Sequence, residues 1–256
     1  MPRESVRMRG SVLESQEAPD VLVNGGGRSP YVLICEHASN RVPRALGTLG
    51  LAEPELQRHI AWDIGAEQVA RQVSRLIDAP LVLQRYSRLV YDCNRPPDSA
   101  DAMPEISETT HIPGNQHLSP ADRLARISEI YRPFHAAIAD LLDGRAAAGA
   151  RSMVVTIHSF TPVYKGTPRA VELGILHDRD TGLAAKLITS FPTVAARLNE
   201  PYGPKDGVLH TLNLHAAPRG LQHVMIEMRN DLISHERGRD EWAERLSASL
   251  AHAAVP

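Results

Sequence analysis

Short stretches of mainly apolar residues are the feature that most constrains the fold of this chain of 256 residues. They lie at residues 31–35, 81–83, 89–91, 153–157, 171–176 and 224–226. The first, YVLIC, and the fourth, MVVTI, are rich in branched side chains and too short for a core helix. Such runs are typical of strands that are buried on both faces of a sheet.

Amphipathic stretches that predict helices separate these strands. They lie at residues 62–76, 119–144 and 181–198, and from residue 239 onward. Asp63 is expected in the first turn of its helix, and Ser119 is a predicted N-cap with Asp122 three residues later. The alternation predicts an α/β fold with a mostly parallel or mixed central sheet and helices on both faces. In such sheets ligands bind beyond the carboxyl ends of the strands.

The length and composition of the chain are those of one ordinary globular unit. With 28.0 kDa and 43% hydrophobic residues, residues 29–256 can bury a single core, so we expect one domain. Residues 1–28 are polar and contain a Gly-Gly-Gly run, which predicts a flexible N-terminal arm. Residues 94–118 are polar and contain proline, which predicts a long loop of the kind that often carries function.

Charge and apolar patterning exclude several classes of partner. The net charge of −2 and the scattered Lys and Arg residues argue against nucleic acid, and no apolar run approaches the roughly 20 residues of a membrane span. We therefore expect a small polar substrate and a cytoplasmic protein, in which Cys35 and Cys93 are reduced. The oligomeric state stays open.

Polar side chains follow four of the predicted strands directly. They are His37, the group Asp92, Asn94 and Arg95, then His158, and finally Glu227 with Arg229. Charge at a buried strand end is costly unless it pairs, binds a metal or holds a substrate. Their coincidence at one edge of the sheet predicts a functional site there.

Two histidines and a carboxylate are a normal ligand set for catalytic zinc. His37 and His158 supply the histidines. Glu36, Asp63 and Asp92 are the carboxylates near this edge, and we prefer Asp63 as the third ligand while the other two remain alternatives. The sequence thus predicts one zinc ion per chain.

The remaining polar residues suit hydrolysis of an amide. Glu227 is the predicted general base, which takes a proton from water and delivers it to the leaving nitrogen. Asn94 and the two-pronged donor Arg95 are predicted to bind a substrate carboxylate. Arg88 is predicted to polarise the scissile carbonyl, with Arg229 as an alternative for that role and as a further substrate-binding residue.

Several motifs occur in a recognisable order. They are HASN at 37–40, AWDIG at 61–65, YDCNRP at 91–96, IHS at 157–159 and IEMRNDL at 226–232. With them the chain resembles the N-formylglutamate amidohydrolase family from about residue 31 to 232. The resemblance implies a fold like that of the zinc carboxypeptidases, in which an Asn-Arg pair grips the substrate carboxylate. It also implies hydrolysis of an N-acyl amino acid, with N-formyl-L-glutamate giving formate and glutamate in the type reaction.

Departures from the family pattern leave alternatives. Asn40 stands where a His-x-x-Glu pair would place its acid, which motivates a non-catalytic carboxylate-binding module that retains the fold. Residues 35–40, CEHASN, differ from the Pro-His-Ser-Gly form of the histidine-degrading members, so the substrate could be another N-acyl amino acid or a peptide. A thiol hydrolase that uses Cys35 or Cys93 is disfavoured, because apolar surroundings raise a thiol pKa.

Overall fold

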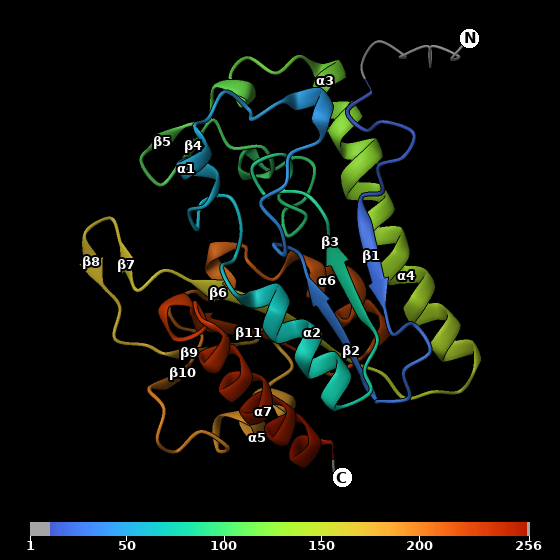
Figure 1. The fold of residues 1–256 in the computed structure, drawn as a ribbon. Coiled ribbons are helices and arrows are strands. Elements are labelled where there is room, and N and C mark those ends of the chain that lie inside the picture. Colours follow the sequence, from blue (N-terminus) through green and yellow to red (C-terminus); the bar gives the residue numbers. More distant parts are fainter. Residues whose placement is uncertain (1–10, 255–256) are drawn as a thin grey trace.

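The computed structural model describes residues 11–254, whose centre is a seven-stranded sheet in the order β1-β3-β2-β6-β11-β9-β10 (Figure 1). The strands are β1 (Asp20–Val23), β2 (Tyr31–Cys35), β3 (Leu81–Gln84), β6 (Met153–Phe160), β9 (Leu173–Leu176), β10 (Ala196–Leu198) and β11 (His223–Arg229). Strands β3, β2, β6 and β11 are mutually parallel, whereas β1, β9 and β10 run against them. The sheet is therefore mixed, as predicted.

Helices cover both faces of this sheet. One face carries α2 (Ala66–Leu76), α5 (Gly182–Ile188) and α7 (Glu236–Ala253), and the other carries α4 (Arg132–Ala147) and α6 (His210–His215) (Figure 1). Alternate residues of one strand pack on opposite faces of the sheet. Leu33 of β2 packs in the core under α2, α5 and α7, and Val32 packs in the core under α4 and α6. Within residues 11–254, no helix combines the length and the apolar character that a membrane span requires.

Smaller elements lie in the connections between the strands, most of them beyond the carboxyl ends of the parallel strands. Two hairpins pair β4 (Ile106–Ser107) with β5 (Thr110–His111) and β7 (Val163–Tyr164) with β8 (Thr167–Pro168). A single helical turn forms α1 (Glu53–Leu56), and 3-10 turns occur at Arg44–Leu46, Ala100–Ala102, Pro113–Asn115, Pro204–Asp206, Ala217–Arg219 and Asn230–Leu232. These elements occupy the predicted 94–118 loop and the other connections at this edge.

The helix predicted from Ser119 is confirmed at its start. Ser119 Oγ accepts the amide of Asp122 at 3.1 Å and the Asp122 carboxylate accepts the amide of Ser119 at 3.2 Å, which is a capping box. The helix continues as α3 (Pro120–Arg126), a π-helical turn and α4. It ends at Ala147 rather than near Gly144.

One predicted strand is wrong, and one predicted helix is shorter than expected. Residues 89–91 form a buried turn, because the Ser87 carbonyl accepts the amide of Val90 and the Ser87 hydroxyl accepts that of Leu89. These residues are apolar because they are buried in the core, and they pair with no strand among residues 11–254. Residues 181–198 hold only the short helix α5, followed by a loop and the edge strand β10.

The helix expected from residue 62 begins only at Ala66, after Gly65. This glycine has φ of 81°, and a Cβ there would lie 2.4 Å from the carbonyl oxygen of Ile233. The close approach places the helix start against the last loop of the sheet. Asp63 consequently lies before the helix and outside its first turn, which corrects the predicted position.

Part of the predicted N-terminal arm belongs to the fold. Residues 20–23 form β1, which pairs antiparallel with β3 at the sheet edge, and Glu129 Oε2 accepts the backbone amides of Val12 and Leu13 at 3.0 and 2.8 Å. The prediction of a flexible arm is wrong for these residues. Residues 1–10 of that prediction lie outside the described residues.

Candidate active site

The polar residues predicted from the sequence gather beyond the carboxyl ends of the four parallel strands. From β2 the chain continues to β3 on one side, and from β6 it continues to β9, β10 and β11 on the other, so the connections diverge between β2 and β6. Ligands bind at such a switch point in open α/β sheets. His37 lies two residues beyond β2, while His158 and Glu227 lie within β6 and β11 as register partners.

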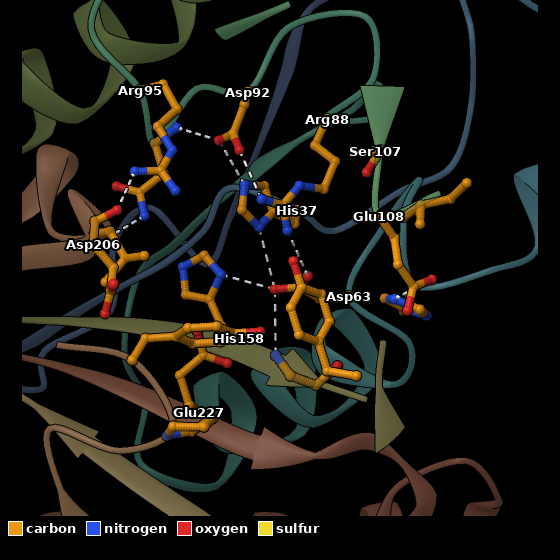
Figure 2. Close-up of a pocket in the computed structure, with 18 of the residues that line it drawn as sticks. His37, Asp63, Arg88, Asp92, Arg95, Ser107, Glu108, His158, Asp206 and Glu227 are labelled. Atoms are coloured by element: carbon orange, nitrogen blue, oxygen red, sulfur yellow. Dashed lines mark hydrogen bonds and ion pairs between the residues drawn. The ribbon is translucent and has the colours of Figure 1, made fainter. Parts of the chain in front are cut away.

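His37, Asp63 and His158 meet at this point through one carboxylate oxygen. Asp63 Oδ2 lies 3.3 Å from His37 Nδ1 and 2.8 Å from His158 Nδ1, and all three side chains are buried (Figure 2). Tetrahedral zinc with ligands at about 2.1 Å requires neighbouring ligand atoms about 3.4 Å apart. The chemistry of these donors suits a metal ion, and their atoms, which all lie within 4.8 Å of one another, would draw closer together to reach that spacing.

The two other candidate carboxylates hold the far nitrogens of the histidines. His37 Nε2 lies 2.7 Å from Asp92 Oδ1. His158 Nε2 lies 3.0 Å from Glu36 Oε2, an ion-pair contact whose angle falls outside hydrogen-bond geometry. Carboxylates in this position orient a metal-binding imidazole and raise its basicity. Of the three carboxylates, Asp63 is the one that lies between the two histidines.

Opposite charges shift the pKa values throughout this cluster. Burial opposes protonation of His37 and His158, but the surrounding carboxylates outweigh it and raise both pKa values. Burial likewise opposes ionisation of Asp63 and Asp92, yet the imidazolium charges of the histidines lower their pKa values. The site thus holds enough buried negative charge to favour a bound cation in place of the histidine protons.

Asn40 lies apart from this cluster. Its side-chain amide donates to the carbonyl of Leu56 at 2.9 Å. Since Asp63 supplies a carboxylate between the two histidines, the lack of an acid at position 40 does not deprive the site of a third ligand. The feature that motivated a non-catalytic module is therefore explained by the fold.

Glu227 lies beside the cluster with its carboxylate largely removed from water. The residue is 5% exposed, and its Oε2 atom has no hydrogen-bond partner in the described part of the chain. Burial, together with the negative charge of Asp63, raises the pKa of Glu227 from 4.5 to about 7 despite the opposing charge of His158. A carboxylate with a pKa near the working pH is suited to general base catalysis.

The structure separates the two arginines assigned to the scissile carbonyl. Arg88 lines the cavity beside the cluster, with NH2 2.8 Å from Asp92 Oδ2 and NH1 3.5 Å from Asp63 Oδ1. Arg229 lies at the end of β11 outside the cavity wall, where its Nε donates to Asp231 Oδ1 at 2.8 Å. The prediction that Arg229 faces the site is not met, because the strand has passed the cavity before residue 229.

Asn94 and Arg95 both line the cavity but differ in what their side chains do. Asn94 Oδ1 accepts the amide of Thr211 at 3.0 Å, and Asn94 Nδ2 donates to the carbonyl of Val208, so this amide fastens the 208–211 segment. Arg95 NH1 donates to the carbonyl of Asp206 at 2.7 Å and leaves the rest of its guanidinium available. Figure 2 shows Arg95 and Asp206 on one side of the cluster and Ser107 and Glu108 on the other.

The family of the chain follows from comparison with known proteins. The model of the N-formylglutamate amidohydrolase family matches residues 29–234, which is most of the chain. The chain belongs to this family. It is accordingly an amidohydrolase, and the resemblance inferred from the motifs is confirmed. No match was found among curated protein sequences.

Solved structures similar to this amidohydrolase include two that span nearly its whole length. The crystal structure of gene product Atu2144 from Agrobacterium tumefaciens is 48% identical, with a TM-score of 0.92 and coverage of 94% of this chain and 97% of that one. N-formylglutamate amidohydrolase from Ralstonia eutropha JMP134 is 21% identical, with a TM-score of 0.68 and coverage of 93% and 97%. At that identity the second likeness supports the fold.

The cavity of this amidohydrolase, of about 460 Å³, includes wall residues that the sequence did not indicate. They are His59, Glu108, Tyr164, Arg169, Tyr202 and Asp206. All six belong to hairpins or loops rather than to strand ends, so neither period nor position after a strand identifies them. The one available signal was Asn94-Arg95, a loop pair that also lines the cavity at this edge of the sheet.

Other histidines and the two cysteines lie away from the cavity wall of the amidohydrolase. His215 Nε2 bonds to His135 Nδ1 at 2.8 Å, and His210 Nε2 lies 2.9 Å from the hydroxyl of Tyr131, so neither histidine reaches the cavity wall. Cys35 and Cys93 are fully buried, and burial raises the pKa of both thiols. They are packing residues, as the sequence predicted, rather than nucleophiles.

Proposed function

We propose that this amidohydrolase is metal-dependent and holds one zinc ion through His37, Asp63 and His158. Its substrate is an N-acyl amino acid of the N-formyl-L-glutamate type, which it hydrolyses to formate and the free amino acid. The observation that carries the proposal is the buried cluster around Asp63 Oδ2, which opens into the cavity beside Glu227. His₂-carboxylate sets of this kind are typical of hydrolytic zinc enzymes.

When bound, zinc supplies a Lewis acid that polarises a carbonyl and lowers the pKa of a water molecule. Glu227 accepts the proton of the attacking water and transfers it to the leaving nitrogen, a role that its pKa near 7 favours. Asp92 and Glu36 hold the far nitrogens of the histidines, so that the Nδ1 atoms keep facing Asp63.

Substrate binding falls to the arginines of the cavity. Arg88 is held by Asp92 and Asp63 with 30% of its side chain exposed to the cavity side, where it stabilises negative charge on the carbonyl oxygen. Arg95 binds the substrate α-carboxylate with the donors that Asp206 leaves free. Asn94 acts on binding by fastening the segment that carries Val208 to the cavity wall.

We also propose a location and a class of partner for this amidohydrolase. The enzyme acts on a small carboxylate in the cytoplasm, where free buried thiols such as those of Cys35 and Cys93 stay reduced.

The test combines metal analysis with formate release. The purified protein should hold about one zinc per chain and release formate from N-formyl-L-glutamate, and removal of the metal should abolish the release. Glu227→Gln should retain zinc and lose activity by about 10²- to 10⁴-fold. Glu241→Gln is the matched control, because Glu241 is an exposed residue of α7 paired with Arg237.

Two results would contradict this function. Full activity without bound metal would show that the reaction does not depend on zinc. Activity retained in Glu227→Gln would show that Glu227 is not the base.

A further inference from the structure

The three arginines of the cavity wall differ in how their charge is balanced. Arg88 is paired with the carboxylates of Asp92 and Asp63. In contrast, neither Arg95 nor Arg169 has a carboxylate within 4.0 Å among the residues that the structure describes. A guanidinium that lines a cavity without an acidic partner is available for an anionic ligand.

An aromatic cage holds Arg169. Its guanidinium carbon lies 4.7 Å from the ring centre of Tyr164, 4.8 Å from that of Tyr202 and 5.6 Å from that of Phe160. NH1 donates to the hydroxyl of Tyr202 at 2.9 Å and to the carbonyl of Thr161 at 3.5 Å. Contacts with aromatic faces fix a guanidinium without neutralising its charge. The cage thus orders the side chain before a ligand arrives.

One edge of this guanidinium remains free. Within residues 11–254, Nε and NH2 of Arg169 donate to no other residue. Together they form the two-pronged edge that matches the two oxygens of a carboxylate.

The backbone of Arg169 is fixed from two sides. Its amide donates to the carbonyl of Pro162 at 2.8 Å, which closes the base of the β7–β8 hairpin. Its carbonyl accepts a hydrogen bond from Arg229 NH1 at 3.3 Å. Arg229, which the sequence placed in the site, therefore supports Arg169 from behind the cavity wall.

We infer that Arg169 is the specificity-determining residue that binds a second carboxylate of the substrate, carried on the amino acid side chain. The inference rests on the proposed function, in which Arg95 binds the α-carboxylate. The enzyme accordingly selects N-acyl derivatives of acidic amino acids over those of neutral ones. Arg169 binds through its positive charge and the paired donors Nε and NH2. Tyr164, Tyr202 and Phe160 hold its guanidinium in place.

The experiment compares two substrates of nearly equal shape, N-formyl-L-glutamate and N-formyl-L-glutamine, by kcat/KM. In Arg169→Gln the value for the glutamate substrate should fall about 10- to 100-fold, the loss expected for a hydrogen-bonded charge pair. The value for the glutamine substrate should change by less than about threefold. Arg169→Lys should lie between, because it keeps the charge and loses the fork.

Arg197→Gln is the matched control, since Arg197 is an exposed residue of β10 outside the cavity wall. It should leave the ratio of the two substrates unchanged. Equal losses for both substrates in Arg169→Gln would leave their ratio unchanged, would show that Arg169 only supports the hairpin, and would overturn the inference. Wild-type values for both substrates would overturn it as well.

Failure of the proposed function is distinguishable, because wild type would then hydrolyse neither substrate. Calorimetric binding of the two compounds to Glu227→Gln, with and without Arg169→Gln, decides the role of Arg169 in that case. Tighter binding of the glutamate compound that depends on Arg169 supports the inference, and equal binding of the two compounds refutes it.

Discussion

Replacing Glu227 by Gln should stabilise the metal-free protein at alkaline pH, although the same change removes the proposed base. Glu227 is buried, and burial together with the charge of Asp63 raises its pKa from 4.5 to about 7. The folded state therefore binds the Glu227 proton more tightly than the unfolded state does. Glutamine has nearly the same size and stays neutral at every pH.

The magnitude follows from this shift. Wild type loses the contribution of protonated Glu227 as the pH rises from about 4.5 to about 7, since only the unfolded state releases the proton freely in that window. At about 1.4 kcal/mol per pKa unit, the loss is about 3 kcal/mol above pH 7. For a chain of this length that corresponds to about 6 to 12 °C in Tm.

The assay is urea and thermal unfolding with a chelator present, at pH 5 and pH 8. Glu227→Gln should exceed wild type by less than about 1 kcal/mol at pH 5 and by about 3 kcal/mol at pH 8. Glu241→Gln, at an exposed position of α7, should stay within about 0.5 kcal/mol of wild type at both pH values. A Glu227→Gln protein that is no more stable than wild type at pH 8 would refute the raised pKa and the argument for a base tuned near neutrality.

Three further predictions concern the metal cluster and a helix remote from it. Asp63→Asn should fold but lose the stabilisation of about 3 kcal/mol that zinc at 100 times its Kd gives wild type. If adding zinc raised the Tm of this variant as much as that of wild type, Asp63 would not be a ligand. Asp92→Asn should weaken zinc binding about 10- to 100-fold in competition with a chelator, because His37 loses its carboxylate; unchanged affinity would show that Asp92 does not act through His37. Ser119→Ala should cost about 1 kcal/mol in urea unfolding and leave formate release unchanged, since it removes only the capping box with Asp122.

Much of the fold was readable because its signals are local. Continuous apolar runs predicted β2, β3, β6 and β11, since strands buried on both faces carry such runs wherever they pair. The capping box at Ser119 likewise lies within four consecutive residues. By contrast, the direction of β9 and the edge pairing of β1 depend on partners far away in the chain, which no local pattern encodes.

Errors arose where tertiary contacts override a local pattern. Residues 89–91 are apolar because they are buried, but Ser87 binds their amides in a turn. The start of α2 is set by the approach of Gly65 to Ile233, 168 positions later in the chain, and that approach leaves Asp63 outside the helix. In both places a distant or irregular contact decided the backbone.

The sequence by itself determined the buried parallel strands, the edge at which the chemistry gathers, and the roles expected of His37, His158 and Glu227, because residues at the carboxyl ends of parallel strands share that edge. Only the tertiary structure decided which carboxylate lies between the two histidines. The Nδ1 atoms converge on Asp63 Oδ2 across 26 and 95 positions of chain, whereas Glu36 and Asp92 reach the opposite nitrogens. Likewise Arg169, on a hairpin, takes the place expected for Arg229, because the direction of a side chain is fixed only once the strands have paired and the loops have packed.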